Sequence, residues 1–188
     1  DSVDFKNVSP KVSLDWQVDD NTLVYGLISR GFKSGGFNIR ANTAAVPASA
    51  APFDDESVTS VEIGTKKSWN EDTLFLNASL FHNKYEDIQL SVFSAFDSNG
   101  DGTDDAFFGD FTNAGKATVQ GLELELQWMA TDRFSVSGNA AWLDAEYDEF
   151  VTRGVDVSDA QIMTNAPELS GALTLAYTWP AFGGELSA

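Results

Sequence analysis

Leu122-Glu123-Leu124-Glu125-Leu126-Gln127-Trp128 alternates apolar and polar residues without interruption. Because successive side chains of a β-strand point to opposite faces, this alternation predicts a strand with one apolar and one polar face. Such a strand separates two environments, one that accepts leucine and tryptophan and one that accepts carboxylates and amides.

The same alternation recurs along the chain in seven segments. They span about residues 11–18, 22–33, 57–69, 73–93, 116–129, 134–150 and 167–179, and residues 184–188 resemble the start of an eighth. Several of these segments exceed the usual strand length of about five or six residues in globular proteins. No run approaches the roughly 18 consecutive apolar residues of a membrane-spanning helix. The pattern therefore predicts an all-β, antiparallel fold.

The connections between these segments differ sharply at the two ends of the strands. Trp16, Trp69, Trp128 and Trp179 lie beside short turns, whereas long acidic loops at about residues 34–56, 96–112 and 151–166 join the other ends. Short turns with an aromatic belt opposite long loops are typical of β-barrels in outer membranes. We therefore expect a transmembrane β-barrel segment of about seven to eight strands.

This interpretation assigns the two faces of each strand. We expect the following residues to face lipid: Leu122, Leu124, Leu126, Val136 and Leu175. We expect Glu123, Glu125, Gln127 and Asn139 to face a wet lumen, where the glutamates would pair with cations on neighbouring strands.

Composition excludes several classes of function. The 188 residues include 29 acidic and 11 basic side chains, which gives a formal charge of −18. Nucleic-acid binding needs clustered Lys and Arg, so we expect no nucleic-acid partner. The chain has no cysteine and a single histidine, His82, without a recognisable partner motif for metal binding or a catalytic triad. A transition-metal site or a Ser-His-Asp triad therefore has little support.

The string Ser29-Arg30-Gly31-Phe32-Lys33-Ser34-Gly35-Gly36-Phe37-Asn38 combines two cations with paired glycines. Glycines permit a close backbone approach, so Arg30 and Lys33 are candidate ligand-binding residues for an anion. A strand that simply ends in a loop explains the same string.

The acidic loop after the fourth segment carries oxygen ligands at alternate positions, with Gly102 after the third of them. This spacing matches the first half of a calcium-binding loop. The candidate Ca²⁺ ligands are Asp97, Asn99, Asp101, Thr103 and Asp105. Phe108 occupies the position of the bidentate glutamate of an EF-hand and cannot bind the ion, and a solvated acidic loop is the alternative.

Aromatic residues bracket this loop, which is unusual for a solvated segment. Phe107 and Phe108 are candidate ligand-binding residues on an outer surface. Packing of the aromatic rings against each other, which would hold the loop folded, is the alternative.

The Ser29–Asn38 string resembles a barrel strand of TonB-dependent outer-membrane receptors. Further strings resemble the same family in order: residues 61–66 (VEIGTK), 76–81 (LNASLF), 85–89 (YEDIQ), 113–117 (NAGKA), 121–125 (GLELE), 142–147 (WLDAEY) and 165–167 (NAP). The resemblance covers nearly the whole chain, and its ordered succession is more specific than any one string.

The resemblance implies that residues 1–188 are the later part of a plugged barrel of about 22 strands in the bacterial outer membrane. It implies active uptake of a scarce, bulky nutrient, typically a ferric siderophore and in some relatives cobalamin, haem or an oligosaccharide. The implied partners are the lipid bilayer, TonB and a plug domain. The resemblance also implies that the protein is not an enzyme, because the work of transport comes from the inner-membrane proton gradient through TonB. Neither the plug domain nor the TonB-contacting box is visible in this sequence.

Two other classes of protein share parts of the pattern. A passive porin or an adhesin barrel would have the same wall without a plug. A soluble calcium-binding β-module would use the Asp97 loop as a structural site and would be monomeric in plain buffer.

Overall fold

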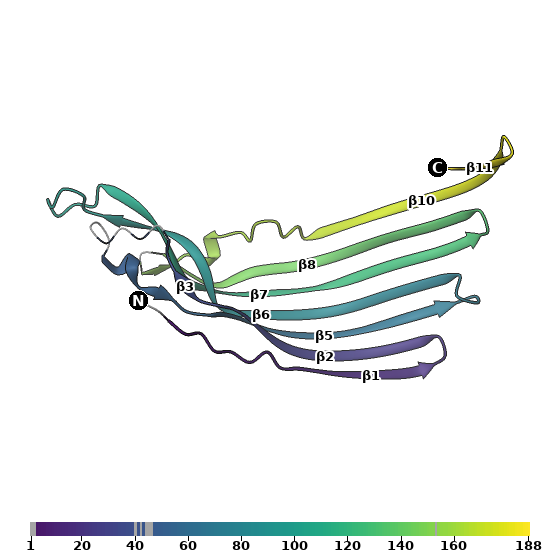
Figure 1. Ribbon diagram of the computed structural model, residues 1–188, viewed down its shortest axis with the longest axis horizontal. Helices are drawn as coiled ribbons and strands as arrows, with labels where there is room; N and C mark the ends of the chain where they lie inside the picture. The colour runs from purple at the N-terminus through teal and green to yellow at the C-terminus, as the bar shows by residue number, and fades with distance from the viewer. Residues whose placement is uncertain (1–2, 40, 42, 44–46, 153) are drawn as a thin grey trace.

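The structure is a computed structural model that describes residues 3–39, 41, 43, 47–152 and 154–188. Its main feature is one antiparallel sheet in which strands adjacent in the chain pair with each other (Figure 1). The strands follow in the order β1 (Lys11–Asp19), β2 (Thr22–Lys33), β5 (Glu56–Trp69), β6 (Leu74–Phe96), β7 (Ala106–Thr131), β8 (Phe134–Thr152), β10 (Leu169–Ala181) and β11 (Gly184–Ser187). The predicted all-β antiparallel fold is confirmed.

The remaining elements are short and lie in the long connections. Strands β3 (Gly36–Phe37) and β4 (Pro52–Phe53) pair with each other, and β9 (Val155–Asp156) pairs with β8. The 3₁₀ helices are η1 (Pro47–Ala50) and η2 (Ser158–Ala160). Neither helix in the described part of the chain is long and apolar enough to cross a membrane.

The register of the strands separates an apolar from a polar face. Leu124 pairs with Ala78 on β6 and with Ala140 on β8, whereas Glu125 pairs with Asn77 and Asn139. Directly paired residues lie on the same face of a sheet. The residues predicted to face lipid therefore share one face, and those predicted to face the lumen share the other.

The sheet is a single layer with almost no interior. Among the described residues, the buried hydrophobic ones are Val92, Ala114 and Ala117. Leu14 on β1 is 76% exposed and Leu173 on β10 is 70% exposed, although both lie on the apolar face. A continuous apolar face of this extent is not stable in water. It matches a wall that lipid covers on one side.

The short turns lie together at one end of the sheet (Figure 1). The β1–β2 turn is closed by Asp19, whose carboxylate accepts hydrogen bonds from the Asn21 amide (2.9 Å) and the Thr22 hydroxyl (3.1 Å). Trp16, near this turn, is 64% exposed on the apolar face. The expected belt at the short-turn end is confirmed, and exposed indole rings at that level suit a membrane interface.

One long connection differs from the expectation. Residues 106–115 were expected outside a strand, yet Phe96 pairs with Ala106 and Val92 with Asp110, so β6 and β7 continue as a paired ribbon. We call residues 88–113 the arm. The register shifts between Tyr85 and Gln89, and Asp87 has a φ of 56°. The expected segment 73–93 already crosses this bulge, so the part that was missed is the return strand. In residues 106–115 the adjacent Phe107 and Phe108, followed by Gly109, break the alternation that marks a strand.

The separation of the two faces predicts opposite effects for the same charge. Leu124→Arg in the intact receptor should lower the free energy of unfolding by about 2–4 kcal/mol, because it places a cation in hydrocarbon. Asn139→Arg is the matched control on the polar face and should change it by less than about 0.5 kcal/mol. Urea-induced unfolding in liposomes measures both values. Equal losses in the two variants would contradict the assignment of the faces.

Candidate functional site

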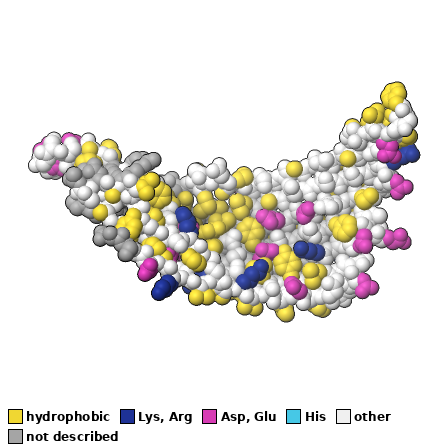
Figure 2. Space-filling view, viewed as in Figure 1, with side chains coloured by type: hydrophobic (Ala, Val, Ile, Leu, Met, Phe, Trp, Pro, Cys, Tyr) yellow, Lys and Arg dark blue, Asp and Glu magenta, His cyan; other side chains and the backbone are white. Residues whose placement is uncertain are grey.

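The polar face of the sheet carries charged side chains midway between its ends. Figure 2 shows acidic and basic side chains over the middle of the sheet. A shallow groove of about 390 Å³ lies on this face, and Tyr25, Ser79, Glu123, Glu125 and Asn139 are among the residues that line it. We call this surface, together with Glu62, the polar wall.

Neutral donors hold the carboxylates of the polar wall. The Asn77 Nδ2 donates to Glu125 Oε2 (2.9 Å), and the Gln127 Nε2 donates to Glu125 Oε1 (3.1 Å). The Tyr25 hydroxyl donates to Glu62 Oε1 (2.6 Å). The polar wall therefore presents oriented carboxylates whose negative charge these neutral partners leave in place.

This arrangement corrects one expectation. Glu123 and Glu125 were expected to pair with cations on neighbouring strands. Within the described residues, the ion pairs are Lys33–Glu56, Lys84–Glu86 and Lys116–Glu149, and none includes either glutamate. The physical reason is the register, because Glu125 pairs with Asn77 and Asn139 on its two neighbouring strands.

Gly64 makes room for the tyrosine that orients Glu62. Tyr25 and Gly64 are paired across β2 and β5, and the Tyr25 ring lies directly over the glycine. A Cβ atom at position 64 would lie 2.5 Å from the ring. The glycine in the string Val61–Lys66 thus has a packing role that the sequence pattern did not reveal.

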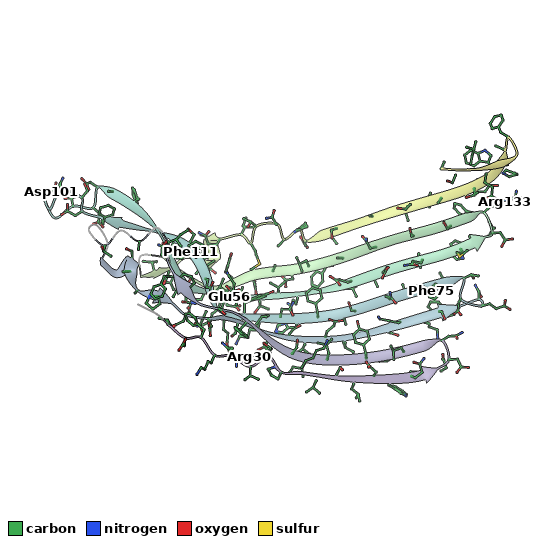
Figure 3. The ribbon with its side chains drawn as sticks, in the orientation of Figure 1. Arg30, Glu56, Phe75, Asp101, Phe111 and Arg133 are labelled. Carbon is green, nitrogen blue, oxygen red and sulfur yellow. The ribbon has the colours of Figure 1, made fainter. Side chains whose placement is uncertain are left out.

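Arg30 and Lys33 do not converge on one site. They are three residues apart in β2 and so lie on opposite faces of the strand. The Arg30 Nη2 lies 3.4 Å from the Ser57 hydroxyl, and the Lys33 ammonium pairs with Glu56 at 3.7 Å. In Figure 3, Arg30 points away from the sheet.

The paired glycines beside these cations serve a packing contact. A Cβ atom at Gly36 would lie 3.1 Å from the Phe53 ring, and one at Gly35 would overlap the carbonyl oxygen of Phe53. The close approach of β4 to β3 therefore accounts for both glycines.

The tip of the arm is an acidic loop closed by its own backbone. Asp97 accepts hydrogen bonds from the amides of Gly100 (2.6 Å) and Gly102 (2.6 Å), and Asp101 accepts from the Thr103 amide (2.8 Å). Figure 3 shows Asp101 at this tip, far from the strands of the wall. Among the described residues, no group of three or more His, Cys, Asp or Glu side chains is arranged to hold a metal ion. Calcium binding at this loop stays a prediction.

These hydrogen bonds shift the acidity of the tip. The Gly102 amide and its neighbours lower the pKa of Asp97, and the Thr103 amide lowers that of Asp101. The Ser98 amide has the same effect on the pKa of Asp105. In each case the amide stabilises the ionised carboxylate.

The aromatic candidates on the arm have different surroundings. Phe107 is 66% exposed, whereas the Phe111 ring packs against Phe53 with ring centroids 6.0 Å apart. The side chain of Phe108 lies outside the described residues. The Phe111 ring thus links the arm to the β2–β5 loop, and both the ligand-binding role of Phe107 and Phe108 and the packing of the loop's aromatic rings against each other stay predictions.

Two amides at the base of the arm were missed by pattern analysis. Gln89 and Asn113 pair with each other across β6 and β7 and bind the β2–β5 loop. The only signal in the sequence was that Gln89 ends, and Asn113 begins, one of the strings that resemble a known family.

Comparisons with known proteins agree with this geometry. Residues 1–187 match a family model described as TonB dependent receptor-like, beta-barrel. The chain is 30% identical over 131 residues to the pesticin receptor of Yersinia enterocolitica, which covers 69% of this chain and 17% of that protein. It is 25% identical over 169 residues to the metal-pseudopaline receptor CntO of Pseudomonas aeruginosa, covering 90% of this chain and 20% of that protein.

A solved structure shows the same arrangement of strands. The ferric yersiniabactin uptake receptor FyuA from Yersinia pestis superposes with a TM-score of 0.68 at 23% identity, over 94% of this chain and 24% of that chain. The chain spans about a fifth of the length of the two curated relatives named above. At this identity, the structural likeness supports the fold of a barrel wall.

The depressed pKa values of the tip predict its response to acid. A carboxylate whose pKa is lower in the folded protein than in the unfolded chain stabilises the fold. This stabilisation is complete above the ordinary pKa, which is 3.8 for Asp97, and is lost as the pH falls through the lower pKa of the folded state. A spin label at Asp104 should therefore stay immobile above pH 3.8 and become mobile only as the pH falls below that value. A label in the turn at residues 70–72 controls for general unfolding. Release of the tip near neutral pH would contradict the assigned hydrogen bonds.

Proposed function

Because the chain belongs to the β-barrel family of TonB-dependent receptors and so lies in the bacterial outer membrane, we propose that it forms part of the wall and outer loops of an active-transport receptor. The observation that supports this most is the single-layer sheet with one apolar and one polar face along its whole width. Lipid is the partner of the apolar face, and the polar face lines the path of the cargo.

We propose a ferric siderophore as the cargo. One relative is named a metal-pseudopaline receptor, and one structural neighbour is named a ferric yersiniabactin uptake receptor. A bulky metal chelate cannot cross a lipid bilayer unaided. Uptake against a concentration gradient then requires energy, which TonB would supply from the inner membrane.

The polar wall suits a plug domain as a partner. Glu62 on β5 and Glu123 and Glu125 on β7 project carboxylates from the same polar face, on either side of β6, with Glu62 and Glu125 held by neutral donors. A plug that presents arginine or lysine side chains would neutralise this charge through hydrogen bonds stronger than those between neutral groups. The wall would then hold the plug by charge rather than by apolar contact, which allows release during transport.

The outer loops would form the cargo-binding surface. Loops of such receptors extend from a rigid wall, and binding residues concentrate on such loops. Lys33 and the exposed ring of Phe107 lie at the end with the long connections, so they remain candidates for cargo contact, as do Arg30 and Phe108. No catalytic role is proposed for any residue of this chain.

Uptake by cells tests the transport function. Cells that carry the intact receptor should accumulate radioactive iron from ferric yersiniabactin or another siderophore complex. An uncoupler of the proton gradient should abolish the accumulation, because the energy comes through TonB. Cells without the receptor are the control. Equal uptake with and without the uncoupler would indicate a passive pore and contradict the proposal.

Charge-neutral substitutions test the contact with the plug. Glu123→Gln and Glu62→Gln in the intact receptor should each weaken plug docking by about 1 kcal/mol, since each keeps an acceptor oxygen but removes the negative charge that strengthens the hydrogen bond. The urea concentration at which the plug becomes susceptible to protease reports this loss. Glu71→Gln, in the exposed turn after β5, is the matched control. No difference among the three variants would contradict a plug held by these carboxylates.

A further inference from the structure

The arm leaves the sheet at a bulge, and two side-chain amides lie there. The register of β6 and β7 shifts on both sides of Ile88, and Asp87 takes a φ of 56°. Directly after the bulge, Gln89 pairs with Asn113, so their side chains share one face of the arm. Phe111 lies two residues before Asn113 in β7 and is therefore on the same face.

Gln89 binds both ends of the β2–β5 loop. Its side-chain Nε2 lies within hydrogen-bond distance of three carbonyl oxygens, those of Lys33 (3.3 Å), Ser34 (3.0 Å) and Asp54 (3.1 Å). Its backbone amide donates to Glu56 Oε2 (3.0 Å). Gln89 is 8% exposed, so water competes little for these carbonyl groups. A buried polar side chain with this many partners fixes the position of the chain that it binds.

Asn113 holds the same loop from the neighbouring strand. Its Oδ1 accepts from the Asp54 amide (2.6 Å), and its Nδ2 donates to the Asp54 carbonyl (2.9 Å). The side chain thus pairs with Asp54 as a neighbouring strand would. The same Nδ2 donates to the carbonyl of Asp87 (2.8 Å), which ties the bulge into the junction.

Contacts within the loop complete the junction. The Gly35 amide donates to Asp55 Oδ1 (2.8 Å), which joins the start of the loop to its end. The Phe53 ring packs on Phe111 of the arm with ring centroids 6.0 Å apart. In the view of Figure 3, Glu56 and Phe111 both lie in the region where the arm meets the rest of the sheet.

We propose that Gln89 and Asn113 are positioning residues that fasten both ends of the β2–β5 loop to the arm. The loop and the arm then form one outer unit with a fixed mutual orientation, rather than two independent loops. The consequence of this fastening for cargo binding rests on the proposed function. A receptor that binds cargo at this end presents one preorganised surface, which lowers the entropy cost of binding.

Spin-label distances in the intact receptor test the fastening directly. One label replaces Ile39, which is 97% exposed, and the other replaces Asp104 near the tip of the arm. The chain has no cysteine of its own, which allows selective labelling once cysteines elsewhere in the receptor are replaced. We expect a narrow distance distribution in the parent receptor. Gln89→Met with Asn113→Ala should broaden it, because Met fills the space of Gln89 but cannot donate to the three carbonyls.

The polar wall offers a matched control on the same two strands. Asn77→Ala with Gln127→Met removes an Asn from β6 and a Gln from β7 without touching the arm. This control should leave the distribution narrow. A distribution that stays narrow in the Gln89 and Asn113 variant, or that broadens equally in the control, would overturn the proposal.

A milder variant keeps the test valid if the double substitution does not fold. Asn113→Asp retains the acceptor for the Asp54 amide but removes both donors of the Asn113 side chain. The distribution of label distances should broaden in this variant as well. The receptor should still migrate differently on an electrophoresis gel before and after heating, which marks a folded barrel. Unchanged distances in a folded Asn113→Asp receptor would overturn the proposal.

Cargo binding separates the fastening from the proposed function. With ferric yersiniabactin as the probe, the double variant should bind at least about tenfold more weakly, since binding must now order a released loop. Broadened distances with unchanged affinity would overturn the role of the fastening in presenting cargo. If the parent receptor bound no ferric siderophore, the proposed cargo would fail, while the label distances would still decide whether Gln89 and Asn113 fasten the loop.

Discussion

The backbone of a membrane-embedded strand has no water with which to form hydrogen bonds. Every amide and carbonyl in the hydrocarbon region must therefore bond to a neighbouring strand, and an unsatisfied group costs several kcal/mol. In this chain the ladder runs without interruption from β1 to β10 through strands paired in chain order. Each short turn reverses the chain so that the next strand can pair with the one before it. The bulge at Asp87 lies where β6 and β7 leave the wall and continue as the arm.

The continuous ladder also fixes which side chains meet. Because the pairing aligns Leu124 with Ala78 and Ala140, a one-residue shift would move every leucine of the apolar face into the lumen. The same register gathers Glu62, Glu123 and Glu125 on the opposite face. Carboxylates are tolerated at membrane depth there because that face is polar, whereas the lipid face accepts only apolar side chains at the same depth.

The strands of the wall could be predicted from the sequence, whereas the structure of the outer end could not. Alternation in residues 122–128 and the positions of Trp16 and Trp128 predicted the strands, the two faces and the short-turn end. The return strand of the arm was not predicted, because adjacent Phe107 and Phe108 and the following Gly109 break the period of two. Contacts of Gln89 with the carbonyls of residues 33, 34 and 54 depend on chain segments distant in the sequence, which no local pattern records. Likewise, the separation of Arg30 from Lys33 followed from strand geometry that a motif of cations and glycines does not express.

The central claim is that this sheet is a wall with lipid on one face and a polar lumen on the other. Spin labels placed singly at each position from 120 to 129 in the intact receptor, reconstituted in liposomes, test it most directly. Collision with oxygen, which concentrates in lipid, should be high at positions 122, 124 and 126 and low at 123, 125 and 127. An accessibility profile without this alternation, or one in which a water-soluble nickel reagent reaches both sets equally, would contradict a membrane-embedded wall.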